Sequence, residues 1–462
     1  MMKQQTYSEY KESDVKWLGQ VPVHWNAVSL KWISQRYSGG TPDKSNDAYW
    51  ENGDIPWLNS GSVNDGYITE PSTYITREGF ASSSAKWVPK NALVMALAGQ
   101  GKTKGMVAQL GIRATCNQSM AAIIPKEKFT PRFLYWWLVS NYQNIRNMAG
   151  GEQRDGLNLD MLGSIPCPLL PRPEQTAIAD FLDRETGRID SLMAKKRQLI
   201  ALLKEKRCAL ISHIVTRGLP EAAADEFGLK PHTRFKNSDI EWLGQVPEGW
   251  GVKKVWIERV SRNIELQDGN HGEQHPKAED YVGEGIPFVM ANHIDNGKID
   301  FNKCNYIEKE QADSLRIGFS NEGDVLLTHK GTIGRVGIVQ KSHFPYVMLT
   351  PQVTYYRCLR EIQNRFLFWL MQSKFWQDQL KLLAGLGSTR AYIGLLDQKT
   401  LSFLIPSEKE QFAIATYLDR ETSKLDRLVE KVDAVIARLQ EYRTALITAA
   451  VTGKIDVREV EV

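Results

Sequence analysis

The sequence predicts an α/β protein in which two mixed α/β domains are separated by a long antiparallel two-helix coiled coil, with an internal pseudo-two-fold repeat. The main observation is a long helical motif that occurs twice, at residues 173–216 and 409–452. The residues Leu-Asp-Arg-Glu-Thr are identical in both copies, at 182–186 and 418–422. A second observation is that a stretch of mixed strand-like and loop-like sequence precedes each copy. Because self-similarity at a fixed spacing sets an architecture, the repeat unit is half of the protein.

A shorter segment opens each half and supports the same duplication. The sequence Trp-Leu-Gly-Gln-Val-Pro occurs at 17–22 and again at 242–247. In each half the turn-like Gly-Gln-Val-Pro lies between two tryptophans, and we expect these tryptophans to anchor the opening segment in the core.

The composition describes a folded, multidomain protein of the cytoplasm. A chain of 462 residues is too long for one hydrophobic core. Its apolar runs are too short to span a bilayer, and its first residues lack the apolar stretch of a secretory signal. The five cysteines show no CxxC spacing, which favours reduced thiols in the cytoplasm. Together with the short apolar runs, this predicts a cytoplasmic protein without membrane contact. The net charge of +4 permits nucleic-acid binding but does not argue for it.

The predicted domain boundaries follow from the repeat. Between each opening segment and the next long helix, short β-branched or aromatic runs are bounded by Gly, Pro and Asn, as in strands and loops. The halves correspond loosely here: Ile55-Pro-Trp-Leu matches Ile286-Pro-Phe-Val, while the loops have drifted. This is how two copies of one fold look when they contact different targets. The predicted parts are the domains 1–172 and 237–406, the long helices 173–217 and 407–453, a connector 218–236 and a tail 454–462.

The long helices carry a seven-residue apolar repeat, which is typical of a coiled-coil seam rather than of an ordinary surface helix. Both helices have glutamate near the N-terminal end, at Glu185 and Glu421, and basic residues toward the other end. Antiparallel pairing would therefore set acid against base. With Leu182 and Leu418 at position a, the predicted seam residues are Leu182, Ile189, Leu192, Leu199, Leu203, Leu210, Leu418, Leu425, Leu428, Val432, Val435, Leu439 and Leu446.

The sequence offers no convincing active site and no metal site. The stretch Ala96–Thr103 ends in Gly-Lys-Thr, but it has alanine in place of the first glycine of a phosphate-binding loop and continues as something strand-like. The spacing of His271 and His275 would suit zinc only on a helix, and the surrounding Gly and Pro deny one. No catalytic residue, metal ligand or cofactor site is therefore predicted from these motifs, but their absence alone does not show that the chain is non-catalytic.

Basic and amide residues in the loops of both halves are the candidate DNA contacts, because Arg, Lys, Asn and Gln side chains read base edges and hold phosphates. For any one of them, an ordinary surface residue remains the simpler interpretation. Their loop positions in two divergent copies together favour recognition. The candidates are Lys86, Lys102, Lys104, Arg113, Asn117, Gln118, Arg154, His329, Lys330, Arg335, Gln352 and Arg390.

These features together resemble the DNA-specificity subunit of type I restriction–modification systems. The resemblance covers essentially the whole chain and rests on the repeated helix, the paired openings, the Glu-Gln entry to each helix and the Gly-Ser-Thr-Arg stretch at 387–390. The first half departs from it, with Gly150-Gly-Glu-Gln-Arg154 where the second half has that stretch. A role tied to this loop is therefore less secure in the first half.

The resemblance implies a division of labour. Each half would be a target recognition domain that reads one part of a bipartite double-stranded DNA target. The helices would act as a spacer and as the docking surface for two methyltransferase (modification) subunits, which use S-adenosylmethionine. Restriction/translocase subunits would add cleavage and translocation with ATP and Mg. In such a complex this chain is not an enzyme.

Two other functions remain open from the residues alone. One is a stand-alone nuclease or methyltransferase with degenerate motifs, and the other is a coiled-coil scaffold that binds only proteins. The idea that the helices set the distance between the two half-sites has a physical basis, because a helix of some 40 residues is roughly 60 Å long. Domains held that way could read major-groove segments about 34 Å apart.

Overall fold

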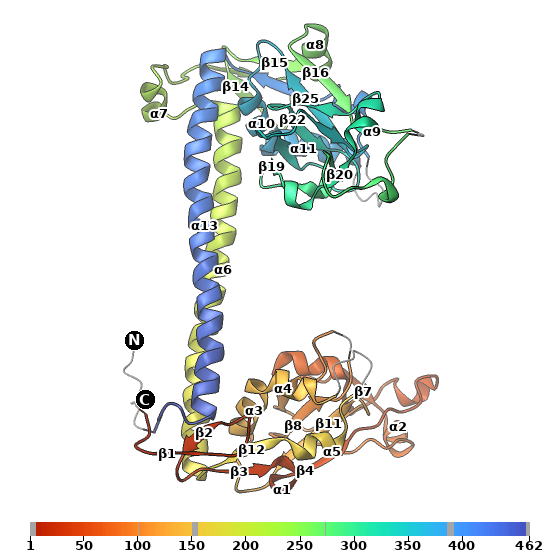
Figure 1. The fold of residues 1–462 in the computed structure, drawn as a ribbon, viewed down its shortest axis with the longest axis vertical. Coiled ribbons are helices and arrows are strands. Elements are labelled where there is room, and N and C mark those ends of the chain that lie inside the picture. The colour runs from red at the N-terminus through yellow and green to blue at the C-terminus, as the bar shows by residue number, and fades with distance from the viewer. Residues whose placement is uncertain (1–5, 100, 150–155, 273, 386–391, 459–462) are drawn as a thin grey trace. The chain divides into compact units, whose positions relative to one another are not determined.

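The computed structural model describes residues 6–99, 101–149, 156–272, 274–385 and 392–458, and the chain divides into two compact units (Figure 1). Unit 1 contains residues 1–196 and 433–462, and unit 2 contains residues 197–432. Each unit therefore holds one mixed α/β domain together with one part of each long helix. The predicted fold class is confirmed at this level.

The domain of unit 1 is built on a five-stranded sheet with strand order β4-β11-β8-β9-β6. A smaller sheet has the order β10-β5-β7, and β12 pairs with β3. The described elements are β1 (Tyr10–Glu12), β2 (Gln20–Pro22), β3 (Asn26–Ser29), α1 (Leu30–Ile33), β4 (Ser34–Ser38), β5 (Ile55–Leu58), β6 (Tyr67–Ile68), β7 (Thr73–Ile75), α2 (Arg77–Ala81), β8 (Leu93–Ala96), β9 (Val107–Leu110), β10 (Thr115–Cys116), β11 (Met120–Pro125), α3 (Pro131–Ser140), α4 (Tyr142–Asn147), α5 (Leu159–Ser164) and β12 (Pro166–Leu169).

The domain of unit 2 repeats this plan with two four-stranded sheets, ordered β16-β25-β22-β23 and β20-β17-β24-β21. The pair β15-β26 corresponds to β3-β12. Its described elements are α7 (Glu221–Glu226), β13 (Phe235–Asn237), β14 (Gln245–Pro247), β15 (Gly251–Lys254), α8 (Val255–Val260), β16 (Ile264–Asp268), β17 (Ile286–Val289), β18 (Ile294–Asp295), β19 (Lys298–Ile299), β20 (Asn305–Ile307), α9 (Lys309–Ser314), β21 (Phe319–Ser320), β22 (Val325–Thr328), β23 (Val336–Ile338), β24 (Val347–Leu349), β25 (Val353–Cys358), α10 (Asn364–Gln372), α11 (Lys374–Ala384), α12 (Leu395–Gln398) and β26 (Ser402–Ile405).

The long helices α6 (Arg172–Arg217) and α13 (Glu408–Val451) pair in the antiparallel direction. In unit 1 the N-terminal part of α6 packs against the C-terminal part of α13, with Leu182 and Ile189 in one hydrophobic cluster with Leu446 and Ile447. In unit 2 the C-terminal part of α6 packs in the same way against the N-terminal part of α13. The predicted direction is confirmed in each unit.

The register of the seam differs from the prediction at its second position. The predicted a positions are buried or half-buried, but Leu192, Leu199, Leu428 and Val435 are 39–46% exposed. The second core-facing position follows four residues after the first rather than three. Thr186, Met193 and Thr422 are buried at this position, and Val429 is half-buried. Apolar residues occupy both the +3 and the +4 positions of this sequence, so the heptad count could not separate the core-facing position from the outward one.

The ion pairs between the helices confirm the direction but use other acids than those expected. Glu185 pairs with Arg184 and Arg188 of its own helix. The cross-helix pairs are Arg443 Nε to Asp190 Oδ1 and, in unit 2, Arg207 Nε to Asp426 Oδ1, each at 2.9 Å. Asp190 and Asp426 occupy the same position of the repeat, as do the two arginines. Half-exposed pairs of this kind contribute about 0–1 kcal/mol each, so they set register more than stability.

The repeated Leu-Asp-Arg-Glu-Thr motif joins each domain to its helix. Asp183 accepts hydrogen bonds from Arg132 Nε at 2.7 Å and from Trp136 Nε1 at 2.8 Å, both on α3. Asp419 binds the equivalent Arg365 and Trp369 of α10. The packing of each domain against its helix therefore explains why this motif is identical in the two halves.

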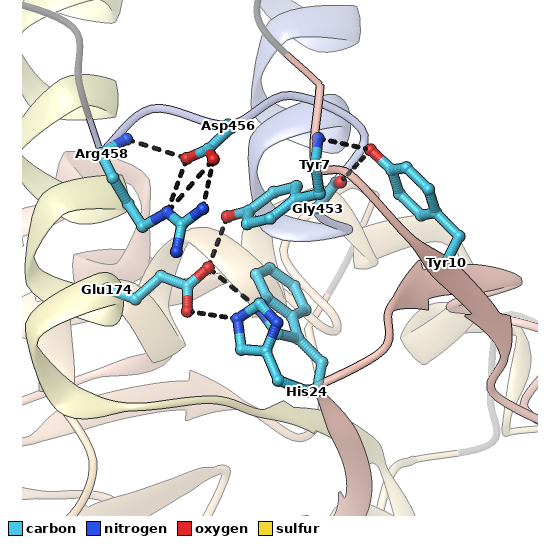
Figure 2. Close-up of polar contacts among 8 residues, drawn as sticks. Tyr7, Tyr10, His24, Glu174, Gly453, Asp456 and Arg458 are labelled. Carbon is cyan, nitrogen blue, oxygen red and sulfur yellow. Dashed lines mark hydrogen bonds and ion pairs between the residues drawn. The ribbon is translucent and has the colours of Figure 1, made fainter.

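The entry to each helix holds the opening segment of its unit, as Figure 2 shows for unit 1. The buried carboxylate of Glu174 accepts hydrogen bonds from Tyr7 Oη at 2.5 Å and from Trp25 Nε1 at 3.0 Å, and it lies 2.9 Å from His24 Nε2. Burial is the main cause that raises the pKa of Tyr7, and the hydrogen bond to Glu174 adds to it, so the phenol stays a neutral donor. In unit 2, Glu410 takes the same role for Trp250.

Glu174 is also where the chain's two end segments meet within unit 1. Arg458, which binds Asp456, lies over the ring of Tyr7, and Tyr10 Oη donates to the Gly453 carbonyl (Figure 2). In unit 2 the partner of the equivalent glutamate comes from one continuous segment. The connector after α6, which contains α7, brings His232 to Glu410. Among the described helices of both units, none combines the length and hydropathy needed to cross a bilayer.

Candidate nucleic-acid interface

The loops that follow β4, β5, β8 and β10 gather at one edge of the unit 1 domain. β4 and β8 both run antiparallel to β11, and β5 runs parallel to β10, so these strand ends meet. Backbone hydrogen bonds connect the loops: Gly40 N donates to Cys116 O at 2.9 Å, and Asn117 N donates to Leu58 O at 2.9 Å. Leu97 N donates to Ser119 O at 2.8 Å. We call this arrangement the loop frame.

The same loop frame recurs in unit 2. Asn270 N donates to Leu349 O at 2.7 Å, Thr350 N to Val289 O at 3.0 Å, and His329 N to Gln352 O at 3.0 Å. Position by position, these donors correspond to Gly40, Asn117 and Leu97 of unit 1. The internal repeat is therefore visible in backbone contacts even where the sequence has diverged.

One glycine in each frame is required by close approach of the backbone. A Cβ at Gly39 would lie 1.8 Å from the Cys116 carbonyl oxygen, and a Cβ at Gly269 would lie 2.1 Å from that of Thr350. No side chain fits at these distances. The frame is thus fixed by the backbone, and the residues beside the glycines are free to differ.

Several polar side chains of the frame are buried without a partner. Asn270 Nδ2, Thr350 Oγ1 and both ring nitrogens of His329 lack a hydrogen bond among the residues that the structure describes, and so does Asn117 Oδ1 in unit 1. Such a group costs about 1–3 kcal/mol when it stays unsatisfied. Asn117 and Thr350 are equivalent positions. Unit 1 has one such atom at this place and unit 2 has several, and either water or a ligand would satisfy them.

The candidate residues of unit 1 fall into separate places. Gln118, beside Asn117, is exposed and accepts a hydrogen bond from Thr41 at the end of β4. Lys86 and Arg113 lie close to the same sheet, with Lys86 Nζ 5.7 Å from the Tyr37 ring and the Arg113 guanidinium 4.2 Å from the Trp87 ring. Two exposed cations therefore lie on aromatic faces, and an aromatic face with a cation is suited to nucleic acid.

Lys102 and Lys104 lie in the loop between β8 and β9 and differ from each other. Lys102 is exposed, and its carbonyl accepts a hydrogen bond from Tyr142 Oη at 2.5 Å. Lys104 is only 5% exposed, which departs from the exposed phosphate contact that we expected. No local pattern indicates this burial, because the loop is rich in Gly and Lys. Two other candidates, Arg154 and Arg390, lie outside the described residues.

The candidates of unit 2 surround its loop frame. Lys330 is exposed next to His329, and its backbone pairs with that of Tyr392. Arg335, also exposed, donates to the Ile294 carbonyl at 3.4 Å, and Gln352 Oε1 accepts from the Ala291 amide. His329 itself is 1% exposed, so the structure places it beneath the surface rather than on it.

Sequence reasoning missed the residues that complete the frame. Asp268, Asn270 and Thr350 follow no motif, and an acid was not sought in a DNA-binding surface. The signal was available in the repeat, because Thr350 takes the place of Asn117.

The Gly-Lys-Thr stretch and the histidine pair both lie in loops. The stretch after β8 returns as strand β9 without opening a helix, so it is not a phosphate-binding loop. His271 and His275 bond to the carbonyls of Gly269 and Asn270 in a loop. Within the described parts of the chain, no group of three or more His, Cys, Asp or Glu side chains is placed to hold a metal ion.

Comparison with known proteins gives a consistent result. Residues 22–201 match the family model of the type I restriction modification DNA specificity domain. The chain is 22% identical over 472 residues to the type I restriction enzyme MjaIX specificity subunit of Methanocaldococcus jannaschii, with 99% of each chain covered. It is 29% identical over 178 residues to the EcoR124I/EcoR124II specificity subunit of Escherichia coli, which covers 38% of this chain and 42% of that one.

Two solved structures share the fold. The HsdS subunit from Thermoanaerobacter tengcongensis aligns with a TM-score of 0.52 at 14% identity, covering 94% of this chain and 98% of that one. A chain from a structure titled for complex assembly and conformational transition of the type I R-M system aligns with a TM-score of 0.65 at 16% identity, covering 93% and 98%.

Proposed function

We propose that this chain is a type I restriction–modification specificity subunit, as its similarity to such subunits supports, and that each of its two domains reads one half of a bipartite DNA target. The observation that supports this is the loop frame, which is the same in both units and carries different side chains. A shared backbone presents both domains to DNA in an equivalent way. Different side chains on it read different bases.

The helices are, in this proposal, the docking surface for two methyltransferase subunits. Support comes from apolar side chains that face water: Leu192 on α6 is 41% exposed, and Leu428 on α13 is 46% exposed. These two residues occupy the same position of the repeat. Leu199 and Val435 form a second equivalent pair. A repeated apolar stripe is unusual on a protein that works alone, and two equivalent stripes fit two equivalent partners.

The chain is non-catalytic in this proposal, and S-adenosylmethionine, ATP and Mg²⁺ act in the partner subunits. Coexpression with the methyltransferase subunits of the same system should methylate adenines in one bipartite sequence, which long-read mapping of N6-methyladenine in the host DNA identifies. A duplex with that sequence should be protected by the purified complex, and a scrambled duplex should not.

The alternatives predict other results. Turnover by the purified chain alone, with DNA and either S-adenosylmethionine or Mg²⁺, would indicate a stand-alone enzyme. A complex that forms with the methyltransferase subunits but selects no sequence would indicate a scaffold that binds only proteins.

We also propose that the helices set the gap between the two half-sites. Removing residues 197–203 from α6 and 430–436 from α13 deletes one heptad from each, leaving both cross-helix ion pairs in register. Seven residues of helix span about 10 Å, so the unread gap should shorten by about three base pairs. Methylation mapping of the double deletion measures this gap. A chain with only the α6 deletion is the control and should fail to assemble, and an unchanged gap in the double deletion would refute the idea that the helices set it.

A further inference from the structure

A chain of buried polar side chains runs through the sheet of unit 2 beneath its loop frame. Asp268 Oδ1 accepts a hydrogen bond from Thr354 Oγ1 at 2.5 Å. Gln398 Nε2 donates to the same hydroxyl at 3.0 Å, and Tyr356 Oη donates to Gln398 Oε1 at 2.9 Å. His329 closes the series, with Nε2 3.4 Å from Asp268 Oδ1. We call these five residues the polar column.

Unit 1 has no titratable group in the equivalent column. Strand pairing places Ser38 and Ala121 where unit 2 has Asp268 and Thr354. The loop frame places Leu97 at the position of His329. A sheet core filled with small and apolar side chains is the ordinary solution. The polar column is therefore a special feature of the second domain, and packing alone does not require it.

Among the residues that the structure describes, Asp268, Lys330 and Tyr392 lie around the His329 ring. Asp268 faces its ring from the end of β16, and Lys330 is the adjacent charge on its own loop. The Tyr392 ring, which is 53% exposed, covers it with a centroid distance of 5.5 Å. Ile393 N donates to the His329 carbonyl at 3.0 Å. Within the described part of the chain, the half-exposed Tyr392 ring lies between the imidazole and solvent.

The imidazole is poised between two protonation states. Burial holds the pKa of His329 below its usual range and outweighs the opposing effect of the Asp268 carboxylate. The ring is therefore neutral near pH 7 in the free protein. DNA brought against Tyr392 adds negative potential at short range, which favours the charged ring. In this structure His329 Nε2 lies 3.4 Å from Asp268 Oδ1 without forming a hydrogen bond. In the protonated ring, Nε2 could donate a hydrogen bond to this carboxylate.

We propose that His329 takes up a proton when the second domain seats on its half-site, so that reading of this half depends on pH while reading of the first half does not. This inference rests on the proposed function. His329 is a positioning residue here, because it acts through Asp268 and Tyr392 rather than on the bases. Proton uptake on binding means that affinity rises as pH falls, between the low pKa of the free ring and the higher pKa of the bound ring.

The test uses the complex with methyltransferase subunits at constant salt, because DNA affinity changes with salt. Affinity is measured by fluorescence anisotropy from pH 5.5 to 8.5 on three duplexes: the mapped target, the target with the second half scrambled, and the target with the first half scrambled. The ratio of affinities for intact and second-half-scrambled DNA should fall toward high pH by up to about tenfold per pH unit, the limit for one proton. The ratio for the first half should stay constant.

Three variants separate proton uptake from packing. His329→Gln should abolish the slope of the second-half ratio. Asp268→Asn keeps an acceptor for Thr354 but removes the charge that favours imidazolium, so the slope should move to lower pH. His293→Gln is the matched control, since His293 is also buried in unit 2 but its Nδ1 already accepts from Met290 N. Thermal unfolding of each complex shows whether the variant is folded.

The outcomes distinguish the inference from the proposed function. Loss of all sequence selectivity in the unaltered complex would contradict the proposed function. Intact selectivity with a flat second-half ratio would overturn proton uptake alone, as would a slope that His329→Gln leaves unchanged. An equal slope on intact and scrambled DNA would mean that uptake follows phosphate binding in general, and it would also overturn the inference.

Discussion

Replacing residues 26–170 with residues 251–406 of the same chain should change one half of the methylated target and leave the other half as it was. Both halves should then be copies of the half-site that the second domain reads. The joints are physically suitable, because Asn26 pairs with Leu169 in unit 1 and Gly251 pairs with Ile405 in unit 2. Each exchanged segment therefore begins and ends on neighbouring strands, and the helices keep their own sequence.

Mapping methylated adenines in cells that carry the exchanged chain measures this result. The reciprocal exchange, with residues 26–170 in place of 251–406, is the control and should duplicate the other half-site. A change in both halves from one exchange would show that the domains do not read independently.

Replacing Glu174 with alanine should destabilise unit 1 by about 3–5 kcal/mol, the range for breaking a buried, charged hydrogen-bond cluster. The change leaves Tyr7, His24 and Trp25 without their shared acceptor, and the buried donors of Tyr7 and Trp25 then keep their desolvation cost. In a unit of this size the melting temperature should fall by about 10 °C, measured by calorimetry on the purified complex.

Glu185→Ala is the matched control for that experiment. Glu185 lies on the same helix, but its ion-pair partners among the described residues are Arg184 and Arg188, whose side chains are 38% and 76% exposed, so its loss should cost less than about 1 kcal/mol. Equal destabilisation by the two variants would mean that Glu174 does not hold the opening segment through its three partners.

The architecture could be predicted because the duplication presents each helix pattern twice in the sequence. Every inference on the helices could be checked twice, once in each copy, and the antiparallel direction follows from charges that recur. The seam's second position could not be predicted, since Leu192 and Met193 are both apolar and adjacent. Only packing shows that Met193 is buried while Leu192 faces water.

The candidate DNA surface was less accessible to sequence reasoning. Asn117 and Gln118 were found from residue type, and the structure places them on the loop frame. Lys104 has the same chemistry as Lys102 but is buried. Asp268 and Asn270 were missed because their importance lies in contacts with strands about 80 residues away in the sequence, which no local pattern encodes.

The cross-helix ion pairs carry an implication about ancestry. Asp190 and Arg207 lie on one helix, and Asp426 and Arg443 lie on the other, so a polypeptide of half this length has both members of the pair. Two identical copies of such a polypeptide would make the same two contacts as a homodimer. A homodimer can only use one surface twice. Duplication of that gene and fusion of its two copies would have ended this constraint. Each domain could then accumulate its own mutations, while the helices kept their shared sequence.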